Sequence, residues 1–356
     1  MQTEQEKTQN SGRFISLVGA LLILFGMSSR YFLNANSPET RAIELLKNKQ
    51  YDQAIAEIDK GIQDNPKNVE AWTIKGNIYT EIRTYDQALQ AYDQALSLNP
   101  DNVHALSRRC MLHVAMNAFD PAIEDCTRAL EHNPEDAVAL MGRAMGYEAE
   151  NQHDLALKDA GEAIGLMPDK EFVFWLRGMI YSNKGQLDDA RKDFNKAQTL
   201  DPNAKLLLLS RGILNVLQGV YGDAITDLER AAQQTPVEPY SLVWLHLAKM
   251  HAGQDDKQEL EQAMVGMKDD KWPASVVALY VGRATVETVR AQAASGAPSV
   301  REEQACEADY FIGEYYLQQH ERDNAKRALN AAIDSCPKAM SNEKQAAIAE
   351  FKTQGF

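Results

Sequence analysis

The residues of this chain that could carry out chemistry are few and scattered along it. Cys110 and His113 lie three residues apart, a helical spacing that can present a thiolate and an imidazole to one metal ion. A convincing zinc site needs a second pair of ligands, which is missing here, and His113 occupies a core aromatic position. Neither a phosphate-binding glycine loop nor a nucleophile elbow is present. We therefore predict a non-enzymatic chain without a metal or cofactor.

The four cysteines form two candidate pairs. Cys306 begins the first helix of a late hairpin and Cys336 ends its second helix, so these two are placed for a disulfide, although two free thiols also fit the spacing. Cys110 and Cys126 are equally far from a turn near Ala118. The alternative is that this second pair fills small buried sites as free thiols. A disulfide in either pair would indicate an oxidising compartment.

Basic residues recur every 34 positions, at Arg41, Lys75, Arg109, Arg143, Arg177 and Arg211. The positions 16 residues after them hold Glu57, Ala91, Asp125, Asp159, Asp193 and Asp227. Residues equally far from the turn of an antiparallel helical hairpin face each other, so each guanidinium can pair with its carboxylate. The alternative is a basic stripe for an anionic ligand. Because every arginine has its own acid, we favour an ion pair inside each repeat.

The same 34-residue period is visible in prolines and in small residues. The prolines are Pro66, Pro100, Pro134, Pro168, Pro202 and Pro236; one set of small residues is Ala54, Ala88, Ala122, Ala156, Ala190 and Ala224. This period is typical of tetratricopeptide (TPR) repeats, and the basic seventh position resembles the Arg-Gly subclass of bacterial TPRs. One helical hairpin cannot bury its own apolar face, so neighbouring hairpins stack. We predict an all-α TPR superhelical solenoid that recognises proteins.

The predicted organisation begins with a signal peptide or membrane anchor at 1–34. Within it, Phe14–Met27 is uncharged and bounded by Arg13 and Arg30, which fits either a cleaved signal or a retained anchor. The other predicted parts are six TPR repeats at 35–238, an irregular segment at 239–305 with short helices at 257–268, 275–281 and 286–294, and a TPR-like hairpin plus a capping helix at 306–356.

The C-terminal part also resembles a known family. Its stretches LVWLHLAKM, KWPASVVALYVGRATVETV and CEADYFIGEYYLQQHERDNAKRAL resemble the matching part of NlpI-type periplasmic TPR lipoproteins. The matching residues are Trp244, Leu245, Leu247, Ala248, Trp272, Tyr280, Gly282, Tyr310, Gly313, Tyr315 and Tyr316. The resemblance implies an adaptor, dimeric in the known member, that brings a periplasmic protease or cell-wall hydrolases to their substrates.

TPR solenoids bind along a concave face that is lined mainly by the first helix of each repeat. The predicted groove residues are Asn77, His104, Arg108, Met111, Met141, Met145, Phe172, Trp175, Met179, Leu206, Leu209 and Ile213. An open groove of this apolar kind would take a peptide or helix of a partner, and Trp175→Ala would then abolish capture without unfolding the chain. The alternatives are that the helices of 257–294 fold back over the groove or that a second subunit fills it.

The net charge of -14 argues against nucleic acid as a partner. We expect an adaptor of the bacterial cell envelope that is periplasmic, either held in the inner membrane by its N-terminal segment or released after cleavage. A protease or peptidoglycan hydrolase is the expected partner, and a homodimer is consistent with the sequence. Two alternatives remain: a membrane-anchored TPR assembly factor facing the cytoplasm, and an envelope enzyme with its site in 239–305.

Overall fold

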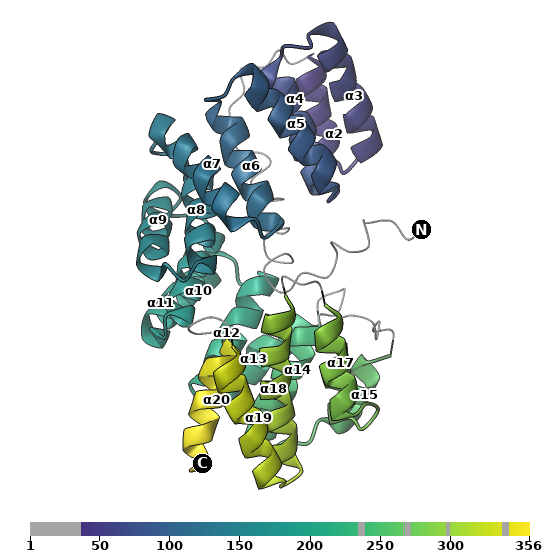
Figure 1. Ribbon diagram of the computed structural model, residues 1–356, viewed down its shortest axis with the longest axis vertical. Coiled ribbons are helices and arrows are strands. Elements are labelled where there is room, and N and C mark those ends of the chain that lie inside the picture. Colours follow the sequence, from purple (N-terminus) through teal and green to yellow (C-terminus); the bar gives the residue numbers. More distant parts are fainter. Residues whose placement is uncertain (1–36, 234–238, 266, 268–271, 297–299, 337–341) are drawn as a thin grey trace. The chain divides into compact units, whose positions relative to one another are not determined.

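The computed structural model describes residues 37–233, 239–265, 267, 272–296, 300–336 and 342–356. The predicted signal or anchor Phe14–Met27 lies outside these residues. The described chain divides into two compact units, with the boundary between Val173 and Phe174 (Figure 1). This boundary falls inside the first helix of the fifth repeat, a position that the repeat period does not mark. Among the helices of the described residues, none combines the length and the apolar composition needed to cross a membrane.

The N-terminal unit is a series of antiparallel helical hairpins, one per repeat. Asn68, Asn102 and Asp136 stand 34 residues apart, and each side chain accepts a backbone N–H in the first turn of the helix that follows it. The period is therefore repeated in the helix caps. The helices are α2 (Pro38–Lys47), α3 (Tyr51–Asp64), α4 (Val69–Glu81), α5 (Tyr85–Leu98), α6 (Val103–Ala115), α7 (Phe119–His132), α8 (Ala137–Ala149) and α9 (His153–Leu166).

Small residues lie where the two helices of a hairpin approach each other. A β-carbon added at Gly76 would lie 2.5 Å from the ring of Tyr92 on the opposite helix. The same addition at Gly212 in the C-terminal unit would lie 2.5 Å from Leu228. Each contact joins residues 16 positions apart, so the repeat period carries this close packing from one hairpin to the next.

The C-terminal unit continues the repeats and then departs from them. Its helices are α10 (Glu171–Asn183, which spans the boundary), α11 (Leu187–Leu200), α12 (Lys205–Leu217), α13 (Tyr221–Ala232), α14 (Pro239–His251), α15 (Lys257–Ala263), α16 (Ala274–Tyr280), α17 (Val286–Ser295), α18 (Arg301–Gln318), α19 (Arg322–Ser335) and α20 (Asn342–Thr353). The core between α14 and α18 contains the fully buried Trp244, whose ring contacts those of Tyr310 and Phe311.

Two boundaries differ from the predicted ones. Helix α15 ends at Ala263, so the predicted 257–268 helix is too long. Helix α18 begins at Arg301, five residues before the predicted start at Cys306. Its first turn contains Glu302 and Glu303, whose negative charges favour the N-terminal end of a helix. The hairpin of α18 and α19 is otherwise the predicted one.

The short helices of the irregular segment pack mainly around α14 and α18. Helices α15 and α16 pack against α14. Helices α16 and α17 pack against each other, and each of them also packs against α18. Helix α14 packs against α12 and α13 of the sixth repeat, and the C-terminal helix α20 packs against α12, α18 and α19. Its Gln345 Nε2 donates to the carbonyl oxygen of Ser182 in α10 at 2.7 Å. A capping helix therefore closes the C-terminal unit onto its own repeats.

Candidate functional site

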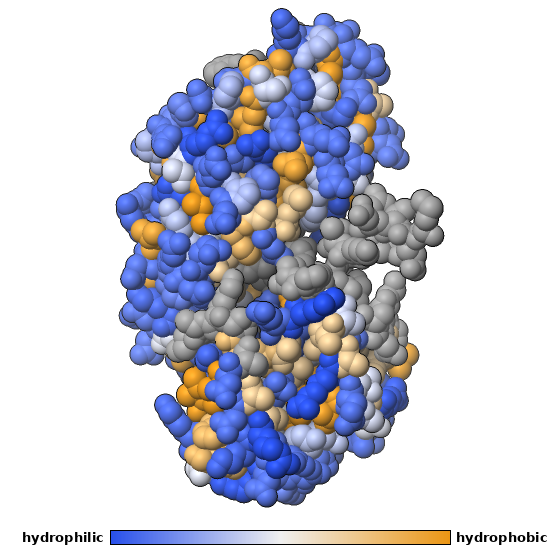
Figure 2. All heavy atoms as spheres, viewed as in Figure 1, coloured by the Kyte–Doolittle hydropathy of each residue, from blue (hydrophilic) through white to orange (hydrophobic). Residues whose placement is uncertain are grey.

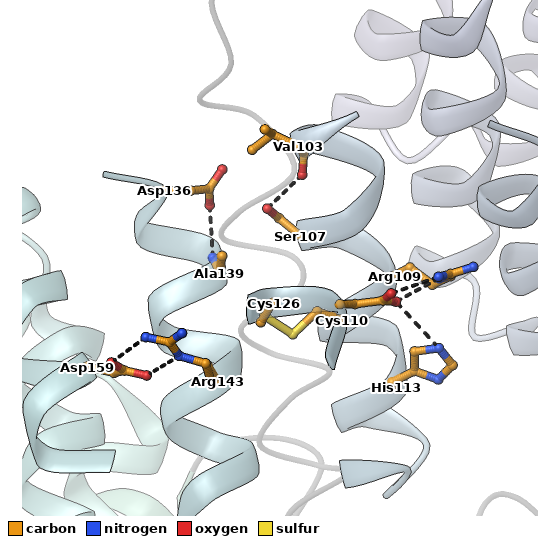
Figure 3. The surroundings of a disulfide bond; sticks show 11 residues. Val103, Ser107, Arg109, Cys110, His113, Cys126, Asp136, Ala139, Arg143 and Asp159 are labelled. Carbon is orange, nitrogen blue, oxygen red and sulfur yellow. Dashed lines mark hydrogen bonds and ion pairs between the residues drawn. A yellow bond between two sulfur atoms is a disulfide. The ribbon is translucent and has the colours of Figure 1, made fainter. Parts of the chain in front are cut away.

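The arginine ladder forms the predicted ion pairs inside the repeats. Arg143 donates from Nε and Nη2 to the two carboxylate oxygens of Asp159, at 2.7 and 2.9 Å (Figure 3). Asp159 is only 2 % exposed in its side chain, so its charge depends on this partner. The bidentate pattern recurs at Arg109–Asp125, Arg177–Asp193 and Arg211–Asp227. These arginines are therefore occupied structurally, which argues against a basic stripe for an anionic ligand.

The structure also links neighbouring repeats through the same positions. Lys75, which faces Ala91 in its own repeat, pairs with Asp59 of the preceding repeat at 2.7 Å. Arg109 uses its remaining Nη1 to contact Asp93 of the preceding repeat at 2.6 Å. The ladder therefore joins repeats to each other as well as the two helices within one repeat.

The four cysteines form two disulfides. Cys110 on α6 is bonded to Cys126 on α7, with their Cα atoms 5.5 Å apart (Figure 3). Cys306 on α18 is bonded to Cys336, which follows α19, with their Cα atoms 5.0 Å apart. Because Cys110 is bonded to sulfur, it offers no thiolate to share a metal with His113, whose ring instead lies 3.7 Å from Asp125.

The predicted groove residues of the N-terminal unit lie on the first helices of their repeats. Asn77 is half-buried and accepts a hydrogen bond from the Tyr92 hydroxyl at 2.8 Å. His104 is half-buried, and burial together with the charge of Arg108 lowers its pKa to about 4. The other predicted residues of this unit are buried: Arg108, Met111, Met141, Met145 and Phe172. The face shown in Figure 2 is mainly hydrophilic, with smaller hydrophobic patches between the polar areas.

The predicted groove residues of the C-terminal unit divide into two kinds. Trp175 is 3 % exposed, and its Nε1 donates to Ser210 Oγ on α12 at 3.0 Å. This indole therefore packs between neighbouring repeats, which contradicts the expectation that Trp175→Ala would spare the fold. Ile213 is likewise buried, whereas Met179, Leu206 and Leu209 keep part of their surface exposed. A partner-binding role for these side chains stays a prediction.

One group of polar residues was not predicted from the sequence. His251 on α14, Glu314 on α18 and Glu350 on α20 each offer a ligand atom within 4.8 Å of the others. These residues are separated by 63 and 36 positions, so no local spacing marks them. His251 and Glu314 meet between α14 and α18, and the docking of α20 adds Glu350.

Comparison with known proteins agrees with the observed packing. Tetratricopeptide repeat models match residues 40–103, 83–146 and 172–204. No curated protein matches the sequence. Among solved structures, PilW, a widely conserved type IV pilus biogenesis factor, is similar with a TM-score of 0.52 and 22% identity over 57% of this chain and 94% of that protein.

Two further solved structures are similar at lower TM-scores. A tetratricopeptide repeat protein from Parabacteroides merdae has a TM-score of 0.49 and 21% identity, over 69% of this chain and 88% of that one. MamA has a TM-score of 0.40 and 23% identity, over 45% of this chain and 94% of its own. Identities at this level show only a shared fold. The chain therefore contains tetratricopeptide repeats at the matched residues and has the fold of a TPR solenoid.

Proposed function

We propose that this chain is a non-enzymatic TPR adaptor of the bacterial cell envelope that brings a protease or cell-wall hydrolase to its client. The observation that carries the proposal is the bonding of all four cysteines in disulfides on a repeat scaffold. Disulfides form and persist in oxidising compartments such as the bacterial periplasm and are rare in the cytosol. The apolar segment Phe14–Met27 would serve as the export signal or inner-membrane anchor of such an adaptor.

The scaffold supports binding rather than catalysis. We expect the first helices of the repeats to line one face, where the half-buried Met179 and Leu206 of adjacent repeats would offer an apolar surface, while Leu209 packs against the core of the C-terminal unit. Methionine adapts its shape to different apolar partners, and an amphipathic helix or extended peptide is the usual occupant of such a surface. The half-buried Asn77 and His104 give the earlier repeats a more polar character.

The identity of the partner rests on the NlpI-type resemblance of the C-terminal part. Trp244, Tyr310 and Gly313, which carry that resemblance, all lie in the core of the C-terminal unit. They therefore support a shared architecture, and the protease or hydrolase partner and the homodimer follow from the family analogy.

The test is a crosslinking pull-down from intact cells with the chain tagged at Phe356. A matched pair of variants separates binding at the predicted groove from nonspecific binding to exposed apolar residues. The groove variant is Leu206→Lys. The control is Leu155→Lys on α9, the second helix of its repeat, where the leucine is already 45% exposed. Enrichment of a protease or cell-wall hydrolase that is lost with Leu206→Lys and kept with Leu155→Lys supports the proposal. Recovery of the chain alone or of cytoplasmic proteins contradicts it.

Topology is tested independently with a reporter that is active only in the periplasm, fused after Phe356. Activity is expected for an envelope adaptor. A silent fusion that is produced at a normal level would favour the membrane-anchored assembly factor facing the cytoplasm.

A further inference from the structure

Three helices of the C-terminal unit bring an imidazole and two carboxylates together. His251 ends α14, Glu314 lies in α18, and Glu350 lies in α20. His251 Nε2 donates to Glu314 Oε2 at 3.1 Å, and a Glu350 oxygen completes a triangle whose sides are all within 4.8 Å. The three ligand atoms come from elements that are far apart in the sequence, so the cluster depends on the tertiary fold.

We propose that His251, Glu314 and Glu350 bind one divalent transition-metal ion, with Zn²⁺ as the best match to this ligand set. Imidazole nitrogen and carboxylate oxygen are both common zinc ligands, at bond lengths of about 2.0–2.2 Å. Two ligand atoms bound tetrahedrally at that length lie about 3.4 Å apart. The distance between His251 Nε2 and Glu314 Oε2 is already close to this value. A modest rotation of the Glu350 side chain would complete three of the four positions.

The two carboxylates of the cluster make its surroundings electrostatically favourable to a cation. Glu314 is 1 % exposed, and its carboxylate accepts the hydrogen bond from His251. Burial and the negative charge of Glu314 raise the pKa of Glu350, against the smaller effects of Gln354 and His251. Burial and the same two carboxylates also raise the pKa of Tyr221, which faces them from α13. A bound divalent ion would offset the repulsion between the carboxylates of Glu350 and Glu314.

The residues behind the ligands hold them in orientation. The imidazole of His251 stacks on the Tyr221 ring, with centroids 5.3 Å apart and planes at 10°. Gln354 Nε2 donates to Glu350 Oε1 at 2.7 Å, which leaves Oε2 available to an ion. Such outer contacts restrict ligand rotation and strengthen metal binding. The His251 side chain remains 19% exposed, so an ion can enter from solvent.

Metal binding here would have a structural consequence. One ion would tie the C-terminal helix α20 to α14 and α18, and a ligand set of three side chains leaves a coordination position for water or for a side chain of a bound protein. The competing occupant is a proton: burial disfavours the imidazolium, but the hydrogen bond to Glu314 and the charges of Glu314 and Glu350 outweigh it and raise the pKa of His251. A protonated His251 would bridge the carboxylates without metal.

The experiment is a Zn²⁺ titration of the full-length chain, without a histidine tag and stripped with a chelator, followed by calorimetry. A parallel Co²⁺ titration reports tetrahedral or five-coordinate binding through its visible absorption. We expect one site per chain, and a weakening of at least about tenfold in both His251→Gln and Glu350→Gln. The matched controls are His132→Gln and Glu302→Gln, which alter an exposed histidine and an exposed glutamate outside the cluster. Both should bind as the natural chain does.

A second readout guards against variants that fold poorly. Zn²⁺ should raise the thermal midpoint of the natural chain and of the controls, and at the same concentration should raise the midpoints of His251→Gln and Glu350→Gln by less. Circular dichroism in chelator establishes that each variant is helical before titration. The proposal is overturned if the natural chain shows no stoichiometric binding, which would leave the proton as the occupant, or if a folded cluster variant binds as tightly as the controls.

Discussion

The close approach of α8 to the Cys110–Cys126 disulfide gives a sharp prediction for Gly142. A β-carbon at Gly142 would lie 2.7 Å from the sulfur atoms of both cysteines and 3.2 Å from Met111 Sδ. A free side chain could rotate away, but a disulfide is held by two helices. We expect overpacking to cost about 3 kcal/mol. Alanine in place of glycine in a helix returns about 1 kcal/mol, so Gly142→Ala should lower the free energy of unfolding by about 2 kcal/mol.

A matched glycine on the next helix should give a change of opposite sign in the free energy of unfolding when it is replaced by alanine. Gly161 lies within α9, and a β-carbon added there meets no atom within 4 Å. Gly161→Ala should therefore stabilise the chain by about 0.5–1 kcal/mol through helix propensity alone. Denaturant midpoints at equal slopes would measure both variants, with the slope checked because repeat arrays can unfold in steps.

A double-mutant cycle separates the clash from any other effect at Gly142. In a Cys110→Ala/Cys126→Ala background the sulfur atoms are gone, so the cost of Gly142→Ala should disappear. The reasoning is refuted if Gly142→Ala is as stable as Gly161→Ala, or if its cost persists without the disulfide.

Three further predictions concern stability. Asp159→Ala should destabilise the chain by about 3 kcal/mol, because Arg143 loses its buried bidentate partner; an unchanged denaturant midpoint would contradict this. Trp175→Ala should cost about 3–5 kcal/mol, and a variant with an unshifted midpoint would mean that the indole faces an open groove. Burial lowers the pKa of His113 below its ordinary value of 6.5. The unfolded chain therefore takes up a proton at this histidine at a higher pH than the folded chain does. The contribution of neutral His113 to the free energy of unfolding is complete above pH 6.5 and is lost as the pH falls from 6.5 toward the pKa of the folded state. As the pH is lowered through that range, the denaturant midpoint should therefore fall less in His113→Gln than in the natural chain. An equal dependence of the midpoint on pH in the two proteins would exclude the effect.

The contacts predicted correctly from the sequence are those that recur at the same positions in successive repeats. The predicted ion pair of Arg109 and Asp125 joins residues 16 positions apart. The same separation recurs at Cys110–Cys126, where free thiols were the alternative, and at Gly76–Tyr92, a contact that was not predicted. Each is a contact across one hairpin, where equal distance from the turn determines which residues meet. A pattern seen once is weak evidence, but a pattern repeated in register specifies both the turn and the facing side chains.

The contacts that could not be predicted are those that sequence separation alone does not specify. The salt bridge from Lys75 back to Asp59 spans the same 16 residues but joins two repeats, so position alone does not distinguish it from a pairing within one repeat. The burial of Trp175 depends on how closely α12, the first helix of the following repeat, approaches α10. The 34-residue period does not specify that distance. The approach of Glu350 to His251 depends on where the last helix docks.

That docking changes how the C-terminal unit holds together. In an ideal solenoid each repeat contacts only its neighbours, so stability is a sum of local terms. Here Gln345 of α20 bonds the backbone of Ser182, 163 residues earlier, and α20 also packs against α12. Fixing a contact at that separation costs chain entropy, which must be offset by contacts formed at the same time. Helix α20 makes them by packing against α18 and α19 as well, so the last helix, the irregular segment and the adjoining repeats share one core. The C-terminal unit is thus stabilised as a globular domain is, whereas the hairpins of α2–α9 retain the neighbour-to-neighbour packing of a repeat array.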